Sequence, residues 1–108
     1  MSDALFVGFD TSNYTTSAAV CDASGQVLVN SRILLPVREG ERGLRQSDAV
    51  FHHTRNLPQV IADVREAVRG RTVAAVGCSV SPRRAVDSYM PCFLAGMAAA
   101  EAFAAAVD

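Results

Sequence analysis

Apolar stretches alternate with short polar segments along the chain, and four of these stretches have the length of strands. They are residues 4–9, 15–21, 26–35 and 72–80. The first and the last are continuous apolar runs, which is typical of strands covered on both faces of a sheet. The third places Val27, Val29 and Ile33 on one face. The segment Asp22 to Gly25 before it offers a glycine for positive φ, and so predicts a tight hairpin turn.

From Gln46 the spacing of apolar positions changes to alternating steps of four and three, which predicts one stripe on a helix of about 22 residues. The stripe consists of Val50, Thr54, Leu57, Ile61, Val64 and Val68. Pro58 interrupts the pattern, so either the helix kinks near it or Asn56 caps a second helix that starts at Leu57. Gly70 is expected to end this helical region, and a separate helix is expected near the C-terminus, over residues 91–107.

The predicted order is therefore β-β-β-α-β-α, with three antiparallel strands, a crossover helix and a strand that returns beside the first. This α/β pattern, with a mixed sheet, matches one lobe of the ribonuclease-H-like, actin-like ATPase (ASKHA) architecture. In such sheets ligands bind beyond the carboxyl ends of the central strands. Residues 10–12 and 78–81 are both expected at that edge.

Length and composition limit the function classes. A chain of 108 residues is long enough for one domain, over residues 1–108, and too short for two. Its 10 basic and 11 acidic side chains nearly cancel, so charge gives no support for nucleic-acid binding. No run reaches the roughly 18 apolar residues of a membrane span, and the N-terminus lacks the pattern of a signal peptide. Three widely spaced cysteines favour reduced thiols and a cytoplasmic location.

Three segments resemble the N-terminal part of the TsaD family, which older annotation calls O-sialoglycoprotein endopeptidase or glycoprotease. They are VGFDTSNYTTSAAV (7–20), RQSDAVFHHTRNLPQVI (45–61) and VAAVGCSVSP (73–82) with SYMPCFLAG (88–96). The resemblance implies an ASKHA fold, ATP with a divalent cation as ligands, and a role in threonylcarbamoyl transfer to adenosine 37 of transfer RNA. Family members have two lobes, so we expect this chain to be the first lobe of a diverged paralogue.

The chain also departs from the family pattern. Asn13 to Thr16 replace a turn with two acids, and residues 81–84, Ser-Pro-Arg-Arg, replace a glycine-rich loop. The family's H-x-x-x-H metal pair would begin just past residue 108. We therefore expect no catalytic residue, no resident metal and no tight binding of ATP by this lobe alone, with transfer RNA contacted only by a full-length parent. The alternative is a TsaB-like assembly module that pairs through its helices.

Five residues are candidates for a nucleotide or phosphate site: Asp10, Thr11, Ser12, Ser81 and Arg83. Hydroxyl groups and turn amides hold phosphate oxygens, and a carboxylate holds a cation directly or through water. The alternative for residues 10–12 is a polar hairpin turn in which Asp10 caps backbone amides. For Ser81 and Arg83, with Arg84, the alternative is a solvated loop.

The adjacent His52 and His53 point about 100° apart on a helix, so they do not form a metal pair; one is expected at the surface while the other packs or caps. Cys92 is expected to be a small core residue.

Finally, the helices at 46–69 and 91–107 are candidate surfaces for a homodimer or for a TsaB- or TsaD-like relative. The second carries Gly96, Ala100 and Ala104 at four-residue spacing, which predicts close approach of another helix.

Overall fold

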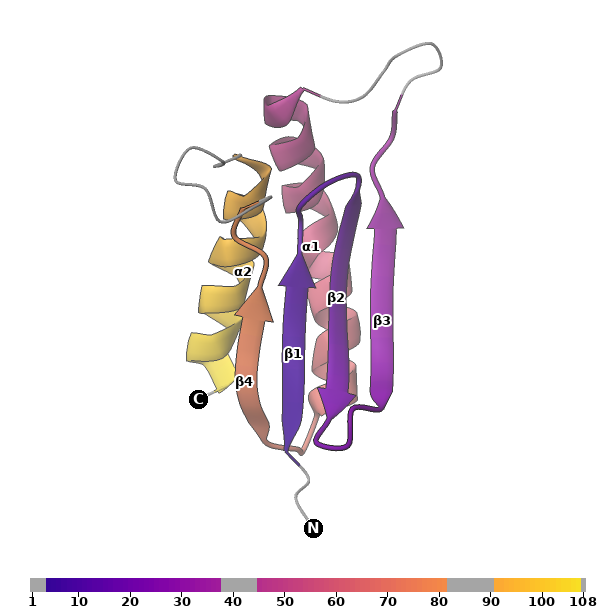
Figure 1. Cartoon of the computed structure of the whole chain (residues 1–108), viewed down its shortest axis with the longest axis vertical. Helices are drawn as coiled ribbons and strands as arrows, with labels where there is room; N and C mark the ends of the chain where they lie inside the picture. Colours follow the sequence, from indigo (N-terminus) through magenta and orange to yellow (C-terminus); the bar gives the residue numbers. More distant parts are fainter. Residues whose placement is uncertain (1–3, 38–44, 82–90, 108) are drawn as a thin grey trace.

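The six predicted elements are all present in the computed structural model, which describes residues 4–37, 45–81 and 91–107. They are β1 (Leu5–Asp10), β2 (Thr15–Asp22), β3 (Val27–Leu34), α1 (Gln46–Val68), β4 (Val73–Cys78) and α2 (Cys92–Val107). The α/β class and the order β-β-β-α-β-α are confirmed, and Figure 1 shows the two helices together on one side of the sheet. None of the described helices is both long and apolar enough to cross a membrane.

The strands form one mixed sheet in the order β3-β2-β1-β4. β1 and β2 pair antiparallel, as do β2 and β3, whereas β4 returns parallel to β1 after the crossover through α1. The parallel pair places the carboxyl ends of β1 and β4 at the same edge of the sheet. The predicted meander with a returning strand is therefore confirmed.

Two glycines mark the predicted turns with positive φ, the region that side chains rarely adopt. Gly25 has a φ of 89°, and the carboxylate of Asp22 accepts hydrogen bonds from the amides of Ser24 and Gln26. Gly70 has a φ of 73°, and the amide of Arg71 closes the end of α1 by donating to the carbonyl of Val68. Turn chemistry read from the sequence thus locates both reversals.

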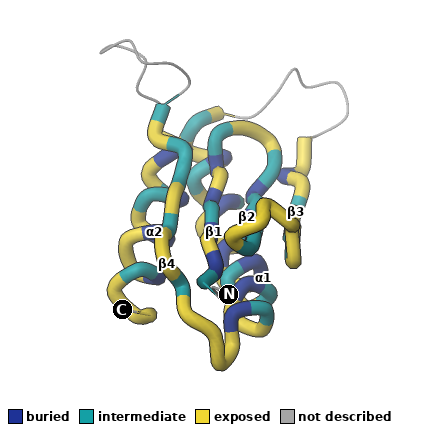
Figure 2. The backbone as a smooth tube through the Cα atoms, turned by 60° about the horizontal axis from the view of Figure 1, so that its bottom comes forward, coloured by how far each residue is buried: buried dark blue, intermediate teal, exposed yellow. Residues whose placement is uncertain are grey.

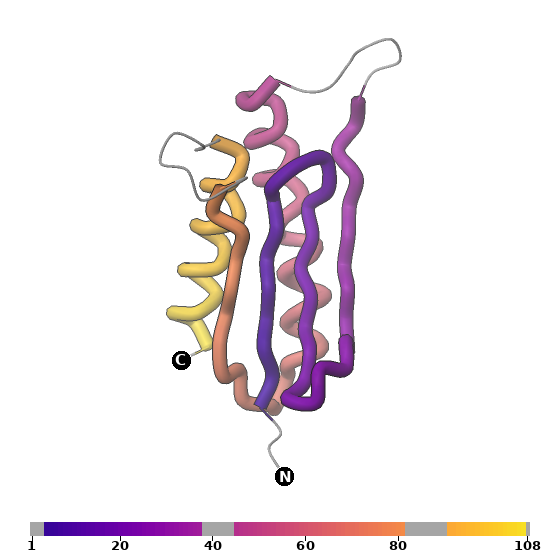
Figure 3. Tube along the Cα trace, in the orientation of Figure 1, coloured from indigo at the N-terminus to yellow at the C-terminus, as the bar shows by residue number. Residues whose placement is uncertain are grey.

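Only one face of the sheet is covered within the described residues, so the expectation that residues 4–9 and 72–80 are buried on both faces is wrong. α1 packs on β2 and β3, and α2 packs on β4 and β1 (Figure 3). Leu5, Val7 and Phe9 point into this layer and are buried, whereas Phe6 on the opposite face is 38% exposed. The tube in Figure 2 is accordingly buried at alternate positions of β1, whereas β4 has intermediate and exposed positions and no buried one.

Val27 also departs from its predicted place. The pairing of β2 with β3 shifts between Val20 and Cys21, and this irregularity turns Val27 away from Val29 and Ile33, which pack on the core. Val27 is 59% exposed and lies on the uncovered face. An extra residue in one strand reverses the side-chain alternation, which the apolar pattern alone does not reveal.

The stripe that α1 presents to the sheet is displaced from the predicted one. Its buried residues are Ala49, His53, Leu57, Val60, Val64 and Val68. Leu57, Val64 and Val68 are buried as predicted. Thr54 is exposed instead, and its hydroxyl donates a hydrogen bond to the carbonyl of Val50. α1 is also one helix that contains Pro58, so the alternative of a second helix starting at Leu57 is wrong.

Candidate functional site

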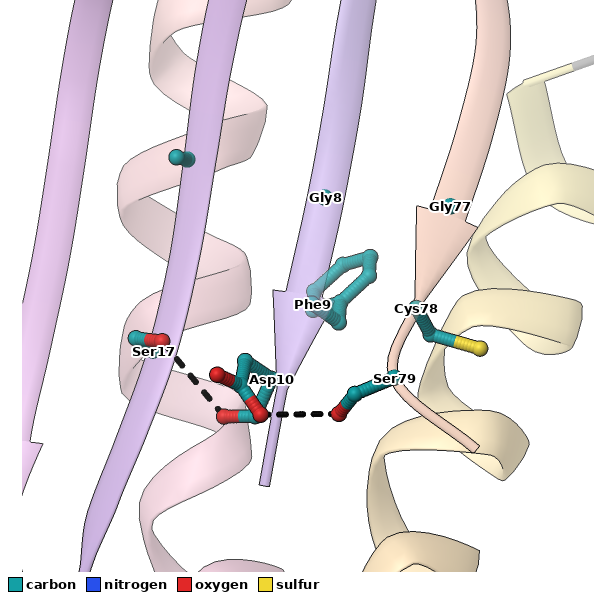
Figure 4. A pocket seen from close by; sticks show the side chains of 8 residues that line it. Gly8, Phe9, Asp10, Ser17, Gly77, Cys78 and Ser79 are labelled. Atoms are coloured by element: carbon teal, nitrogen blue, oxygen red, sulfur yellow. Dashed lines mark hydrogen bonds between the residues drawn. The ribbon is translucent and has the colours of Figure 1, made fainter. Parts of the chain in front are cut away.

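Three polar side chains form a row across the uncovered face, where β1 and β4 end. Asp10 is the last residue of β1 and pairs with Ser17 of β2. Ser79 follows β4, and its amide extends the ladder by donating to the carbonyl of Phe9 at 3.2 Å. The hydroxyl of Ser79 donates to Oδ1 of Asp10 at 2.7 Å, and that of Ser17 reaches the Asp10 carbonyl at 3.5 Å (Figure 4). The two segments predicted to meet at this edge are therefore joined by a hydrogen bond.

Beside this row the sheet carries an open depression of about 360 Å³. Its floor is formed by Gly8 and Gly77, which lie opposite each other in the parallel pair, and by Ala19 on β2. Apart from each glycine's own chain neighbours, no atom of the described residues lies within 4 Å of the position that a Cβ would take at either glycine. Because the two glycines have no side chains to fill this space, the Asp10 carboxylate is accessible from the uncovered face.

The charge of Asp10 is stabilised by its neighbours. Partial burial alone would raise the pKa of this carboxyl, but hydrogen bonds from Ser12 and Ser79 outweigh burial and hold the pKa below its usual value. The amide of Ser12 donates to Oδ1 at 2.9 Å, so Asp10 does cap its own turn, as the hairpin alternative predicts. The bond to Ser79, which directly follows β4, is not part of such a hairpin turn.

Thr11 has a different role from the one predicted. Its side chain is fully buried, its hydroxyl donates to the carbonyl of Cys92 at 2.8 Å, and it accepts from the amide of Gly96 at 3.0 Å. These are a carbonyl and an amide four residues apart on α2, which bond to each other in a regular helix. The Thr11 hydroxyl therefore anchors the turn to α2 and is not available to a phosphate.

The other side of the turn is anchored to α1 by His53, which is fully buried. Its Nδ1 lies 2.7 Å from the hydroxyl of Thr16, and its Nε2 lies 2.9 Å from the carbonyl of Asn13. Asn56 donates to the same Thr16 hydroxyl at 3.2 Å. The prediction that one of the two histidines packs is confirmed, and the residue that packs is His53.

The remaining candidate residues are Ser12, Ser81 and Arg83. Ser12 is half-buried beside Asp10, and its carbonyl receives a weak bond from the buried thiol of Cys92, whose pKa is raised chiefly by burial. Ser81 is half-buried beyond the end of β4, and Ser79 makes the contact that links this segment to Asp10. Arg83 lies outside the described residues. Within them, no group of three or more histidine, cysteine or acidic side chains could hold a metal ion.

This arrangement suits a hydrated cation that arrives with its ligand. Mg²⁺ prefers oxygen donors, keeps several waters, and binds through one or two carboxylates together with substrate phosphates. Asp10 supplies one such carboxylate, and the hydroxyls of Ser17 and Ser79 add polar oxygens beside it. The residues therefore fit a cation brought by a phosphate ligand.

The chain matches no protein-family model, and no curated protein matches it. The resemblance to the TsaD family consequently rests on the quoted segments alone.

Proposed function

We propose that the chain is a phosphate-binding lobe of a TsaD-like protein and that it binds a magnesium nucleotide at the edge where β1 and β4 end. The carrying observation is the 2.7 Å hydrogen bond between Asp10 and Ser79. It fixes an ionised carboxylate at the carboxyl ends of two parallel strands, the place where open α/β sheets hold ligands. The TsaD-like segments favour ATP as the nucleotide and transfer-RNA modification as the process.

The lobe by itself is proposed to bind weakly and to transfer nothing. One wall of a cleft covers a ligand incompletely, and ligand sites usually enclose most of the ligand surface. An affinity on the order of 0.1 to 1 mM corresponds to about 4 to 5.5 kcal/mol and is consistent with one wall. We place this function in the cytoplasm, which the three free cysteines support.

The test is calorimetric titration of the chain with MgATP. Asp10→Asn keeps the shape of the side chain but removes the charge, and Ser79→Ala removes the hydroxyl that fixes it. Both should weaken binding at least fivefold. Asp22→Asn is a matched control, because Asp22 also ends a strand and caps a turn, yet it has no partner on β4. Equal affinity for the Asp10 and Asp22 variants would refute the proposed site.

A second candidate function, pairing through helices, is supported by the outer side of α2. Leu94 is 47% exposed, and Ala98, Ala102 and Ala105 follow it on the exposed side. Apart from Glu101, which is exposed on the same side, the helix carries apolar side chains, and a helix that is apolar on all sides is usually covered on all sides. We therefore propose this stripe as the contact for a second copy or for a TsaB- or TsaD-like relative.

The small-residue stripe that suggested pairing is on the other side of this helix. Gly96 and Ala100 are buried within the chain, and Ala104 is half-buried. The requirement for a small residue at position 96 is internal, because a Cβ there would lie 2.7 Å from the hydroxyl oxygen of Thr11. A dimer through Gly96 and Ala100 would have to displace the chain's own sheet.

A further inference from the structure

The outer edge of β3 is open. Figure 1 shows β3 at one end of the sheet, and within the described residues it pairs only with β2. In an antiparallel ladder, successive residues turn their N–H and C=O groups to opposite edges of the strand. The amide of Leu35 bonds the carbonyl of Tyr14 on the β2 side, which fixes this alternation. Asn30, Arg32 and Leu34 therefore direct their backbone groups away from β2.

This edge lacks the features that usually keep an outer strand single. Such strands are typically very short, or carry lysine or proline. β3 has eight residues, VLVNSRIL, of which only the arginine is charged and none is proline. The irregularity in its pairing lies at its beginning, near Val27, and the ladder over residues 29–34 is regular. This part of β3 can therefore accept a further strand.

A groove beside this edge carries negative charge. It has a volume of about 380 Å³ and lies between β3 and α1, where Asp63 and Glu66 line it. Asp63 is half-buried and accepts hydrogen bonds from the hydroxyl of Ser31 at 2.6 Å and from the amide of Gln59 at 3.4 Å. Glu66 bonds Arg69 at 3.0 Å, and both are largely exposed. Among the described residues no basic side chain forms an ion pair with Asp63, so its charge lacks a neighbouring cation.

These charges distinguish between two kinds of added strand. A second copy that paired through β3 about a twofold axis would bring its own Asp63 and Glu66 toward the same groove, where like charges repel. A strand with lysine or arginine at alternate positions has those side chains on one face, and on the α1 side they oppose Asp63. On the other face, Arg32 lies beside Ser17 and disfavours further basic side chains. The edge is therefore complementary to a strand that is basic on one face only.

We propose that the free edge of β3 binds an extended segment of another protein, basic at alternate positions, which joins the sheet as a further strand. Main-chain hydrogen bonds to alternate residues of 30–34 provide affinity, and basic side chains beside Asp63 provide specificity. This interaction goes beyond the nucleotide site, because β2 separates β3 from the edge where β1 and β4 end. Neither proposal requires the other.

A titration with synthetic peptides tests the interaction. The probe is the blocked peptide Thr-Lys-Val-Lys-Val-Lys-Thr, which has all its lysines on one face when it is extended. The amide chemical shifts of Asn30, Arg32 and Leu34 should change saturably, and binding should weaken as salt is added. The same peptide with glutamate in place of each lysine should bind at least about tenfold more weakly. Absence of saturable shifts, or equal binding of both peptides, would overturn the proposal.

Two aspartate variants locate the charge that recognises the peptide. Asp63→Asn keeps the shape of the side chain but removes its charge, and should weaken binding of the lysine peptide about threefold to fivefold. Asp48→Asn is the matched control, because Asp48 is exposed on the same helix, about 22 Å from Asp63 along the helix axis. Its affinity should equal that of the parent chain. Equal loss in both variants would show attraction to net charge alone and would refute the site.

Two substitutions at Asn30 test the backbone contact. Asn30→Pro removes an N–H group that faces the free edge and takes no part in the ladder with β2, and edge strands accept proline at such positions. Asn30→Ala keeps the N–H group. Circular dichroism should show both chains folded, with peptide binding lost in the first and kept in the second. Binding that survives Asn30→Pro would contradict strand addition.

A modified peptide repeats this test if Asn30→Pro does not fold. In the added strand the N–H groups of the two valines face β3, because their side chains lie on the same face as that of Asn30. The lysine peptide N-methylated at both valines keeps its charges but loses these donors, and should not bind. Unchanged binding of the methylated peptide would refute strand addition.

Sedimentation of the chain without peptide tests a second copy as the occupant. A monomer, or a dimer unchanged by Asn30→Pro, leaves the edge of β3 free, as the proposal requires. A dimer that Asn30→Pro separates would show that β3 pairs with a second copy, and would overturn the proposal.

Discussion

Substituting Gly96 by alanine tests the anchoring of the turn to α2. A Cβ built at this position lies 2.7 Å from Thr11 Oγ1, a separation that real Cβ atoms essentially never show. Thr11 cannot turn aside easily, because it is fully buried and its hydroxyl bonds both Cys92 and Gly96. The substitution therefore forces a shift between α2 and the turn after β1.

Three contributions set the magnitude. Overpacking of a buried site costs roughly 1–3 kcal/mol. Loss of the bond from the Gly96 amide to Thr11 costs about 0.5–1.5 kcal/mol. Alanine in place of glycine in a helix stabilises the fold by about 1 kcal/mol. The free energy of unfolding should therefore fall by roughly 0.5–3.5 kcal/mol. In a domain of this size, each kcal/mol lost lowers the Tm by about 4–8 °C.

A double-mutant cycle isolates the contact. In a Thr11→Ala background Oγ1 is absent and the new methyl group meets the Cβ of residue 11 at an ordinary 3.5 Å. Gly96→Ala should then stabilise the chain by about 1 kcal/mol. Urea unfolding of the four chains, followed by circular dichroism, measures both steps, and Ala98→Gly on the exposed side of α2 gives the helix-propensity contribution alone. Stabilisation of similar size in both backgrounds would refute the contact.

Three further predictions concern acid stability, the core and the outer side of α2. Because the pKa of Asp10 is lowered on folding, its contribution to stability is present above about pH 4 and lost as the pH falls through the folded value. Unfolding titrations between pH 2 and 6 should show a shallower loss for Asp10→Asn; an unchanged slope would contradict this. Leu5→Ala in the buried layer should cost about 2–5 kcal/mol in urea unfolding, whereas Leu34→Ala, at a residue 77% exposed, should stay within about 0.5 kcal/mol. If the chain dimerises through α2, sedimentation should show Leu94→Glu as a monomer with an unchanged fold; an intact dimer would rule out this face.

The topology could be predicted because its signals are local. Asp22 and Gly25 fix one hairpin, Gly70 ends the long helix, and the apolar run over 72–80 calls for a strand beside the first. Which side of α1 faces the sheet in its first turns could not be predicted, because it depends on contacts with distant residues. In the first two turns the structure buries Ala49 and His53 in place of Val50 and Thr54, and there His53 bonds Asn13 and Thr16. Such partners lie about 40 residues away and leave no periodic pattern.

The candidate site was predictable in location but not in every residue. The rule for parallel strands brings Asp10 and the segment 78–81 to one edge. The choice of Ser79 over Ser81 depends on where β4 ends, since the ladder continues through the Ser79 amide. The burial of Thr11 depends on how α2 packs against the turn. The sequence signal for it is Gly96, whose small size predicts close approach of another helix but in the structure makes room for Thr11.

Amide chemical-shift mapping during titration with MgATP tests the nucleotide site most directly. We expect saturable shifts centred on Ser12, Ser17 and Ser79, with a Kd on the order of 0.1 to 1 mM. The same shifts should vanish in Asp10→Asn and persist in Asp22→Asn. Shifts confined to other parts of the chain, or shifts at these residues that survive Asp10→Asn, would contradict the proposal that this carboxylate holds the ligand.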